Sequence, residues 1–474
     1  MTLREVLGAA AAGAPPVEVT ALAYDDRTVT PGTLFFCVPG FTRDGHDFAP
    51  EAVARGAVAL VVERPLGLGV PEVLVPDVRR AMAPAAAALY GDPTAQLQAI
   101  GVTGTNGKTT TAFLVRSLLE AAGRQTGLLG TVTAVVAGRS QEVARTTPEA
   151  IDLQRTFREM LDGGDAAVVM EVSSHALELG RADAIHWAAA IFTNLTQDHL
   201  DFHPTMEDYF LAKRRLFEVA EGVKVVNVDD PYGRRLARDF PDALTIGIES
   251  ANAALRATAI ESGFDGSRFR AGGLELSSPL PGRFNVLNVL GAVAAVRALG
   301  VDDATIAQAL PRAGRVPGRF EPVSEGQDFA VLVDYAHTPD SLDNVLRAAR
   351  ALAERRVVVV FGAGGDRDRG KRPLMGAIAR EHADHVIVTS DNPRSEDPQS
   401  IIDEILDGAG RDVEAYVDRR EAIERAIGEA GAGDVVVIAG KGHEQGQEFE
   451  DGRKVPFDDV TVAREALRGA GATH

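Results

Sequence analysis

The stretch GVTGTNGKTTT, from Gly101 to Thr111, follows a short apolar run and precedes a segment with leucines at 114, 118 and 119. A strand, a Gly-rich turn and a helix in this order are typical of a phosphate-binding loop, because backbone N–H groups can approach oxygen atoms closely where no Cβ intervenes. Gly104 and Gly107 give that access, and Lys108 adds a positive charge for the β- and γ-phosphates. We predict a nucleotide loop and a helix from about Lys108 to Ala122.

The loop departs from the common ATPase pattern G-x-x-x-x-G-K-[ST], because Val102 stands where that pattern has its first glycine. Either Thr109 or Thr110 offers a hydroxyl for Mg²⁺. The alternative is a tight turn from strand to helix with a lysine placed by chance. We favour the phosphate loop because the strand, both glycines and K-T-T occur together.

Strand-like apolar runs alternate with helical segments on both sides of this loop, which is typical of α/β proteins with mostly parallel sheets. Composition shifts at GDPTAQLQ and RAGRVPGR indicate two boundaries. We predict three domains: a small N-terminal α/β domain at 1–95, a central P-loop-type, doubly wound domain at 96–314, and a C-terminal Rossmann-like α/β domain at 315–474.

The chain has 474 residues and a net charge of −19, which argues against nucleic acid or an anionic membrane as a general partner. Its one cysteine, Cys37, excludes an intrachain disulfide, and we expect it to be a small core residue. The sequence shows neither a signal peptide nor a membrane-spanning run. We therefore expect a cytoplasmic protein.

Three residues in the central domain have the chemistry to organise anions. Glu171 directly follows the apolar run AAVVM, and His199 follows NLTQD. Both are expected at strand ends, where open α/β sheets bind ligands, whereas Lys213 lies in a helical segment. Taken singly, each also fits an ordinary surface or capping role. Spacing alone does not show that they converge.

GTNGKTT, MEVSSH, TNLTQDHLDFH and the helical AKRR together resemble the corresponding segments of the Mur ligase family, and the loop also resembles that of folylpolyglutamate synthetases. Both families join an amino acid to a carboxylate through an acyl phosphate. The resemblance implies a catalytic Lys108 and a Mg²⁺ site formed by Thr109, Glu171, His199 and a carbamoylated Lys213. It also implies an ATP loop made of Gly104, Thr105, Asn106, Gly107, Lys108, Thr109 and Thr110.

The resemblance extends over nearly the whole chain and is strongest to the tripeptide-forming members. It implies that a UDP-linked muramoyl dipeptide contacts Asp26, Arg27, Phe41, Thr42, Arg43, Thr146, Thr147, Ser173 and Arg181. Two positions depart from the family pattern: Asp26 replaces a serine, and Leu179 replaces a glutamine. In FNVLN, PGRFE and VDYAHTPDS, the resemblance assigns ATP contacts to Asn288, Arg319, Asp334 and His337.

SDNPR, from Ser390 to Arg394, resembles the motif of family members that select meso-diaminopimelate. A guanidinium holds that substrate's distal carboxylate, whereas the bare cation of lysine or ornithine would be repelled. The amino-acid contacts implied are Arg367, Asp391, Asn392, Pro393, Arg394, Gly440 and Glu444. Lysine and ornithine remain the alternative substrates.

The expected reaction joins meso-diaminopimelate to UDP-MurNAc-L-Ala-D-Glu with ATP as substrate and Mg²⁺ as cofactor. We expect a monomer whose domains close on their ligands. Two other functions remain open. A folylpolyglutamate synthetase would use the same loop, and a nucleotide-binding regulator would keep the loop without turnover.

Overall fold

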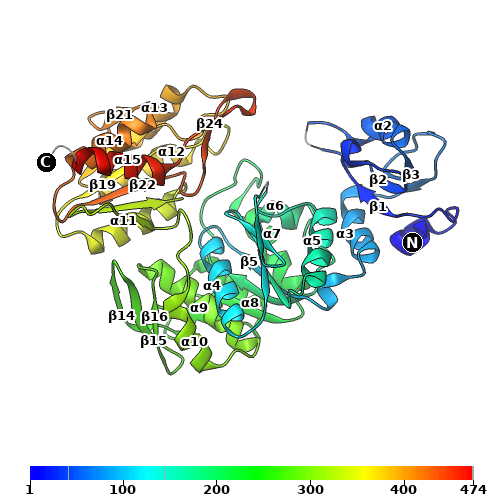
Figure 1. Cartoon of the computed structure of the whole chain (residues 1–474), viewed down its shortest axis with the longest axis horizontal. Helices are drawn as coiled ribbons and strands as arrows, with labels where there is room; N and C mark the ends of the chain where they lie inside the picture. The colour runs from blue at the N-terminus through cyan, green and yellow to red at the C-terminus, as the bar shows by residue number, and fades with distance from the viewer. Residues whose placement is uncertain (41, 144, 472–474) are drawn as a thin grey trace. The chain divides into compact units, whose positions relative to one another are not determined.

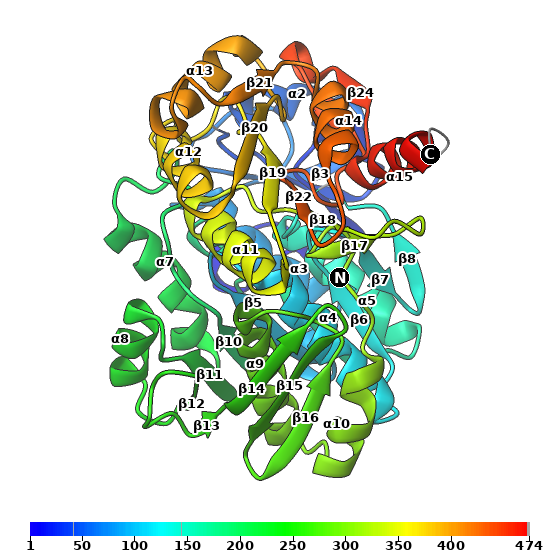
Figure 2. The same ribbon diagram turned by 90° about the vertical axis from the view of Figure 1, so that its left-hand side faces the viewer.

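The computed structural model describes residues 1–40, 42–143 and 145–471 (Figures 1 and 2). Its fold is α/β with mostly parallel sheets, as predicted. Contacts within the chain define two compact units. The first comprises Met1–Thr103, Ala122–Ile191 and Ala212–Lys224, and the second comprises Gly104–Ala121, Phe192–Leu211 and Val225–His474. Among the described residues, no helix is long and apolar enough to span a bilayer.

The N-terminal residues form a four-stranded parallel sheet in the order β1-β2-β3-β4. Alternate residues of its strands enter two different cores: Leu34 and Phe36 pack on one face, and Phe35 and Cys37 on the other. Cys37 is fully buried, as expected. The elements are α1 (Leu3–Leu7), β1 (Ala21–Ala23), β2 (Thr33–Phe36), α2 (Ala49–Ala54), β3 (Ala57–Val62), β4 (Glu72–Leu74) and α3 (Val78–Leu89).

A nine-stranded sheet has the order β13-β12-β11-β10-β5-β9-β6-β7-β8. The chain passes to one side of β5 for β6 and β9 and to the other side for β10, so the phosphate loop after β5 lies at a topological switch point, where such sheets bind ligands. The elements are β5 (Gln98–Thr103), α4 (Lys108–Ala121), β6 (Thr126–Leu129), β7 (Ala134–Val136), β8 (Arg139–Gln141), α5 (Ala150–Asp162), β9 (Ala167–Glu171), α6 (Ser174–Glu178), β10 (Trp187–Phe192), α7 (Met206–Val219), β11 (Val223–Asn227), α8 (Pro231–Asp239), β12 (Leu244–Gly247) and β13 (Leu255–Arg256).

A three-stranded antiparallel sheet follows, which the sequence analysis did not predict. β14 is largely exposed, and β15 and β16 are only partly buried and lack the long apolar runs of the parallel strands, so all three give a weak sequence signal. The elements are β14 (Thr258–Gly263), β15 (Gly266–Ala271), β16 (Leu274–Ser278), α9 (Arg283–Ala298) and α10 (Asp303–Ala309).

The C-terminal residues form a six-stranded sheet in the order β17-β18-β22-β19-β20-β21, with helices on both faces (Figure 2). Leu332 packs with α11–α13, whereas Val331 and Val333 pack with α14 and α15. The elements are β17 (Glu321–Val323), β18 (Ala330–Asp334), α11 (Pro339–Leu352), β19 (Val357–Phe361), α12 (Lys371–His382), β20 (His385–Thr389), α13 (Pro398–Ala409), β21 (Glu414–Tyr416), α14 (Arg419–Glu429), β22 (Val435–Ala439), β23 (Gly446–Glu448), β24 (Lys454–Pro456) and α15 (Asp459–Gly471).

Candidate active site

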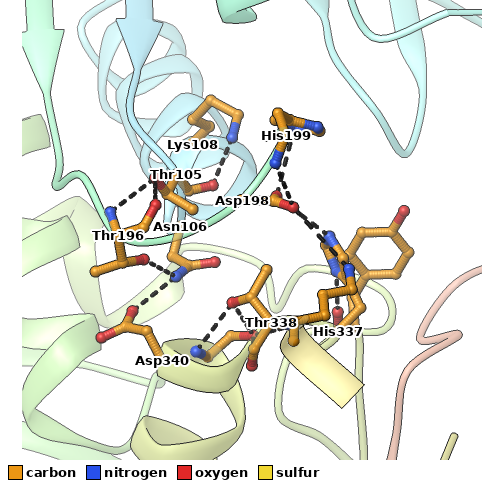
Figure 3. Close-up of polar contacts among 12 residues, drawn as sticks. Thr105, Asn106, Lys108, Thr196, Asp198, His199, His337, Thr338 and Asp340 are labelled. Carbon is orange, nitrogen blue, oxygen red and sulfur yellow. Dashed lines mark hydrogen bonds and ion pairs between the residues drawn. The ribbon is translucent and has the colours of Figure 1, made fainter. Parts of the chain in front are cut away.

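The phosphate loop has the backbone conformation that its glycines predict. Gly104 and Gly107 have φ angles of 149° and 82°, in the region that residues with a Cβ avoid. A Cβ on Gly107 would also lie 2.3 Å from Oδ1 of Asn288 in α9. Helix α4 begins at Lys108, whose Nζ donates hydrogen bonds to the carbonyls of Gly104 at 2.9 Å and Thr105 at 2.7 Å (Figure 3). Lys108 therefore lies folded back along the loop.

The segment after β10 fixes the phosphate loop by hydrogen bonds that the sequence analysis did not foresee. The backbone N–H of Asn106 donates to Oδ1 of Asn194 at 2.8 Å, and Oγ1 of Thr193 donates to the Asn106 carbonyl at 2.6 Å. Oγ1 of Thr105 accepts from the backbone N–H of Thr196 at 3.0 Å (Figure 3). These contacts order the loop through TNLT, residues 193–196, which precede His199 in the chain.

Asn106 also reaches the first turn of α11. Its Nδ2 donates to Oδ2 of Asp340 at 2.7 Å (Figure 3). Burial raises the pKa of the Asp340 carboxyl above its ordinary value, although Asn106 opposes that shift. Thr338 caps the same helix by accepting from the backbone N–H of Ser341. A direct hydrogen bond thereby joins the Gly-rich loop to VDYAHTPDS, the segment predicted to contact ATP.

Asp198 brings two of the predicted histidines together. Its Oδ2 lies 3.4 Å from Nε2 of His199 and 3.8 Å from Nε2 of His337 (Figure 3). Its Oδ1 lies 4.0 Å from Nζ of Lys371. Burial alone would raise the pKa of Asp198, but these three cationic or titratable neighbours hold it well below the ordinary value. His199 has a φ of +55°, a strained conformation for a residue with a Cβ.

Of the remaining predicted ATP residues, Arg319 contacts the start of α4 directly. Nη2 of Arg319 donates to Oγ1 of Thr109 at 3.2 Å, and its guanidinium lies 4.3 Å from the centre of the Tyr335 ring. Thr109 and Thr110 are both buried. Asp334 accepts from the backbone N–H of Phe320 at 2.6 Å, and burial raises the pKa of its carboxyl to about 6, against the opposing charge of Arg319.

Glu171 and Lys213 belong to the first compact unit, whereas Thr109 and His199 belong to the second. Glu171 ends β9, is buried, and accepts hydrogen bonds from Thr131, at 2.7 Å from the backbone N–H and 3.1 Å from the hydroxyl. Lys213 is also buried, on α7. The four-residue metal set stays a prediction.

Four of the residues predicted to contact the muramoyl dipeptide lie close together in the first unit. Oγ1 of Thr147 lies 3.4 Å from Oγ of Ser173, and Nη1 of Arg181 donates to the Thr147 carbonyl at 3.4 Å. Oγ1 of Thr146 lies 3.1 Å from that of Thr131. Arg181 in turn pairs at 3.0 Å with the buried Glu149, a residue that the sequence analysis missed.

The structure gives Asp26 a partner that the sequence did not reveal. Asp26 forms an ion pair with Arg55, so the acid that replaces a hydroxyl here is locally neutralised. Arg27 is largely exposed and pairs with Asp25. Thr42 and Arg43 are exposed. Phe41 lies outside the described residues.

The predicted amino-acid residues gather at the carboxyl edge of the C-terminal sheet. Strands β18, β22, β19 and β20 are parallel neighbours, so the loops that follow them meet at one edge. Nδ2 of Asn392 donates to Oε2 of Glu444 at 2.8 Å. A Cβ on Gly440 would lie 2.4 Å from Oδ2 of Asp391. Asp391, Asn392 and Pro393 are buried, which excludes a freely solvated loop.

Arg394 is held in place by residues that the sequence analysis did not assign. It has a φ of +53°, its Nε donates to Oε2 of Glu448 at 3.0 Å, and its Nη1 donates to the Gly365 carbonyl at 2.7 Å. Within 1–40, 42–143 and 145–471, Nη2 donates no hydrogen bond, so part of the guanidinium is open to a ligand. Arg367 is exposed and lies with Arg394 beside Gly364.

A separate group in the C-terminal sheet combines His385, Glu414 and Glu429 within 4.8 Å of one another. The two ring nitrogens of His385 approach different carboxylates, and Arg425 pairs with both acids. A metal ion would have to displace this arginine and would reach only one ring nitrogen. We therefore assign the group a structural role, in which ion pairs join β20, β21 and α14.

Comparison with known proteins matches three family models in succession: "Mur ligase family, catalytic domain" over residues 18–91, "Mur ligase middle domain" over 102–296, and "Mur ligase, glutamate ligase domain" over 318–442. The chain is 50% identical over 467 residues to the UDP-N-acetylmuramoyl-L-alanyl-D-glutamate–2,6-diaminopimelate ligase of Geobacillus thermodenitrificans, covering 95% of each chain. It is 50% identical over 470 residues to the ligase of the same name from Geobacillus kaustophilus, covering 96% of each.

A solved structure of a UDP-N-acetylmuramoyl-L-alanyl-D-glutamate–2,6-diaminopimelate ligase matches with a TM-score of 0.72 and 34% identity, covering 100% of this chain and 99% of the other. The match therefore includes the N-terminal sheet, the phosphate loop and the C-terminal sheet with its SDNPR loop. Both the identity to the relatives and the matched fold extend over nearly the full length. The chain belongs to the Mur ligase family.

Proposed function

We propose that this protein is an ATP-dependent, ADP-forming ligase that adds meso-diaminopimelate to the γ-carboxylate of D-Glu in UDP-MurNAc-L-Ala-D-Glu, a step of peptidoglycan precursor synthesis. The observation that carries the proposal is the ordered SDNPR loop, in which Asn392 contacts Glu444 while Arg394 keeps an open guanidinium edge. Glu444 can accept hydrogen bonds from an ammonium group, and Arg394 can donate hydrogen bonds to a carboxylate. Both groups lie at one edge of the sheet, which fits the distal end of diaminopimelate.

In the proposed reaction, the γ-carboxylate of the dipeptide attacks the γ-phosphate of ATP and releases ADP. The amine of the incoming amino acid then attacks the acyl phosphate, which releases phosphate and forms the amide bond. Lys108 and Arg319 provide positive charge beside the phosphates at the start of α4. Positioning and charge neutralisation account for this chemistry without a protein nucleophile.

The predicted metal ligands suit Mg²⁺ by their chemistry. Thr109 and Glu171 offer oxygen atoms, which this ion prefers, and the Glu171 carboxylate is held by two hydrogen bonds from Thr131. A carbamoylated Lys213 would add a further oxygen ligand, and His199 a nitrogen. The ion would neutralise charge that develops between ATP and the carboxylate. We propose this set as the Mg²⁺ site.

We further propose that the three domains have the predicted boundaries, 1–95, 96–314 and 315–474, and that the enzyme acts as a cytoplasmic monomer. ATP and UDP-linked precursors are both small soluble substrates, which suits that compartment. Sedimentation of the purified protein would test the monomer, since a mass near twice 50.1 kDa would contradict it.

The deciding experiment is ADP release and peptide product formation with the UDP-linked dipeptide, comparing diaminopimelate, lysine and ornithine in parallel. We expect diaminopimelate to be preferred by about tenfold or more in kcat/KM, because only it offers a distal carboxylate to Arg394. Preference for lysine or ornithine would overturn the amino-acid assignment and keep the ligase.

The remaining functions require different substrates in the same assay. Turnover with a folate-linked carboxylate in place of the muramoyl dipeptide would indicate a folylpolyglutamate synthetase. Nucleotide binding without turnover of any amino acid would indicate a regulatory protein.

A further inference from the structure

Lys441 directly follows Gly440, and its side chain is fully buried. Its Nζ donates hydrogen bonds to Oδ1 of Asn392 at 2.9 Å and to Oε2 of Glu444 at 3.0 Å, and it lies 3.8 Å from Oδ1 of Asp391. The ammonium therefore contacts three of the residues that the proposed function assigns to the amino-acid substrate. A buried ammonium is tolerated only where it is paired and hydrogen-bonded. These contacts therefore hold the Lys441 ammonium in one position.

Lys441 determines the orientation of the Asn392 amide. Oδ1 of Asn392 accepts from Lys441 and from the backbone N–H of Glu448 at 3.0 Å, which leaves Nδ2 to donate to Glu444. Without Lys441, the amide oxygen would keep one donor and Glu444 would lose its cation. Two side chains of the amino-acid site would then be free to turn.

Lys441 also sets the charge of this site. Asp391 and Glu444 carry two negative charges and Lys441 carries one positive charge, so the three together carry a net charge of −1. Two neutral pairs lie beside them, Arg394 with Glu448 and the buried Arg419 with Asp459. One net negative charge next to a partly open guanidinium matches an ammonium and a carboxylate at the same end of a substrate. Loss of Lys441 would leave −2, which favours the bare ammonium of lysine.

We propose that Lys441 is a positioning and specificity-determining residue, which holds Asn392 and Glu444 in place and tunes the site toward an amino acid whose distal end is zwitterionic. The proposal rests on the proposed ligase function. Loss of Lys441 should therefore raise KM for the amino acid and weaken the discrimination among amino acids. The KM for ATP should stay unchanged.

The test is Lys441→Met, which keeps most of the side-chain volume and removes the charge. The matched control is Arg356→Met, which removes a cation from the buried Asp434 at the opposite, amino-terminal edge of the same sheet. For each protein, kcat and KM are measured with diaminopimelate and lysine, KM is measured for ATP, and Tm is recorded.

We expect Lys441→Met to raise KM for diaminopimelate by about tenfold or more, with kcat and KM for ATP within about threefold of the wild type. The ratio of kcat/KM for diaminopimelate to that for lysine should fall by about tenfold. Arg356→Met should lower Tm and leave this ratio unchanged. An unchanged ratio in Lys441→Met, or equal losses for ATP and both amino acids, would overturn the proposal.

If Lys441→Met does not fold, the double variant Lys441→Met with Asp391→Asn provides the test, because it restores the net charge of −1. A substrate ratio within about threefold of the wild type, with a raised KM for diaminopimelate, would support the proposal. If the ratio of kcat/KM for diaminopimelate to that for lysine falls by about tenfold in the double variant despite the restored charge, the proposal is overturned. If the wild-type enzyme prefers lysine, the proposed substrate fails on its own, and the role of Lys441 in positioning Asn392 is tested with lysine.

Discussion

Arg394 shows how a single side chain can be prepared for a ligand before the ligand arrives. Its backbone has a φ of +53°, and Glu448 and Gly365 fix two of its guanidinium nitrogens. The energetic cost of orienting the side chain is therefore met in folding rather than in binding. The same contacts restrict a ligand to the edge that includes Nη2.

We predict that Arg394→Ala raises KM for diaminopimelate by about tenfold to a hundredfold, with a smaller change in kcat, because the variant loses charge-assisted hydrogen bonds and leaves Glu448 without its cation. Steady-state kinetics with varied amino acid measures both constants. The control is Arg411→Ala, which removes an exposed arginine just after the end of α13 and should behave as the wild type. A large loss in kcat at unchanged KM would contradict the clamp.

Among the elements, the starts of β19 and β22 are joined by one buried carboxylate. Asp434 accepts hydrogen bonds from the side chain and backbone N–H of Arg356 and from the backbone N–H of Gly431. Burial would raise its pKa, but these donors lower it to about 2. The two neighbouring parallel strands are therefore tied together where they begin.

This arrangement predicts a specific pH dependence. Because the pKa of Asp434 is lower in the folded than in the unfolded chain, the unfolded chain binds more protons between about pH 4 and pH 2, and stability falls as the pH falls through that window. Asp434→Asn should lack this contribution, of about 2 kcal/mol at pH 5.

Urea unfolding monitored between pH 5 and pH 2 tests this prediction. The difference in stability between the wild type and Asp434→Asn should be largest at pH 5 and should shrink toward pH 2. Asp407→Asn, at an exposed position on α13, is the control. A difference that stays constant over this range would contradict the assigned cause.

Over the full chain, the two terminal sheets depend on their surroundings to different degrees. The buried residues of both cores of the C-terminal sheet lie between Phe320 and Leu467. One core of the N-terminal sheet, by contrast, includes Ala150 and Ile151 of α5, and Tyr24 donates to Asp152 at 2.6 Å. From outside residues 315–474, the partly buried Phe284 of α9 packs against one of the C-terminal cores, so the C-terminal sheet is the more self-contained of the two.

We predict that the fragment 315–474 folds cooperatively alone, whereas the fragment 1–95 is destabilised by about 3 kcal/mol through loss of the burial against α5. Circular dichroism and urea unfolding of both fragments measure this difference. A fragment 1–95 as stable as its counterpart in the intact chain would show that α5 contributes nothing to that core.

The local order of the chain was readable from its residues. GVTGTNGKTTT fixed a strand, a glycine turn and a helix, because φ preferences and apolar periodicity act over a few neighbouring positions. The α/β class followed from the same alternation, and the family followed from the motifs. Strands β14–β16 were not predicted because they lack long apolar runs.

The partners of the site residues were decided only by tertiary structure. Three hydrogen bonds join residues that are 49 to 234 positions apart in the chain: Asn106 with Asp340, Arg394 with Glu448, and Lys441 with Asn392. Each depends on how strands are ordered within a sheet or on how separate sheets and loops pack, and hydrophobic periodicity carries no information about either. The motifs therefore indicated which chemistry is present, and the folded chain determined how those side chains are held.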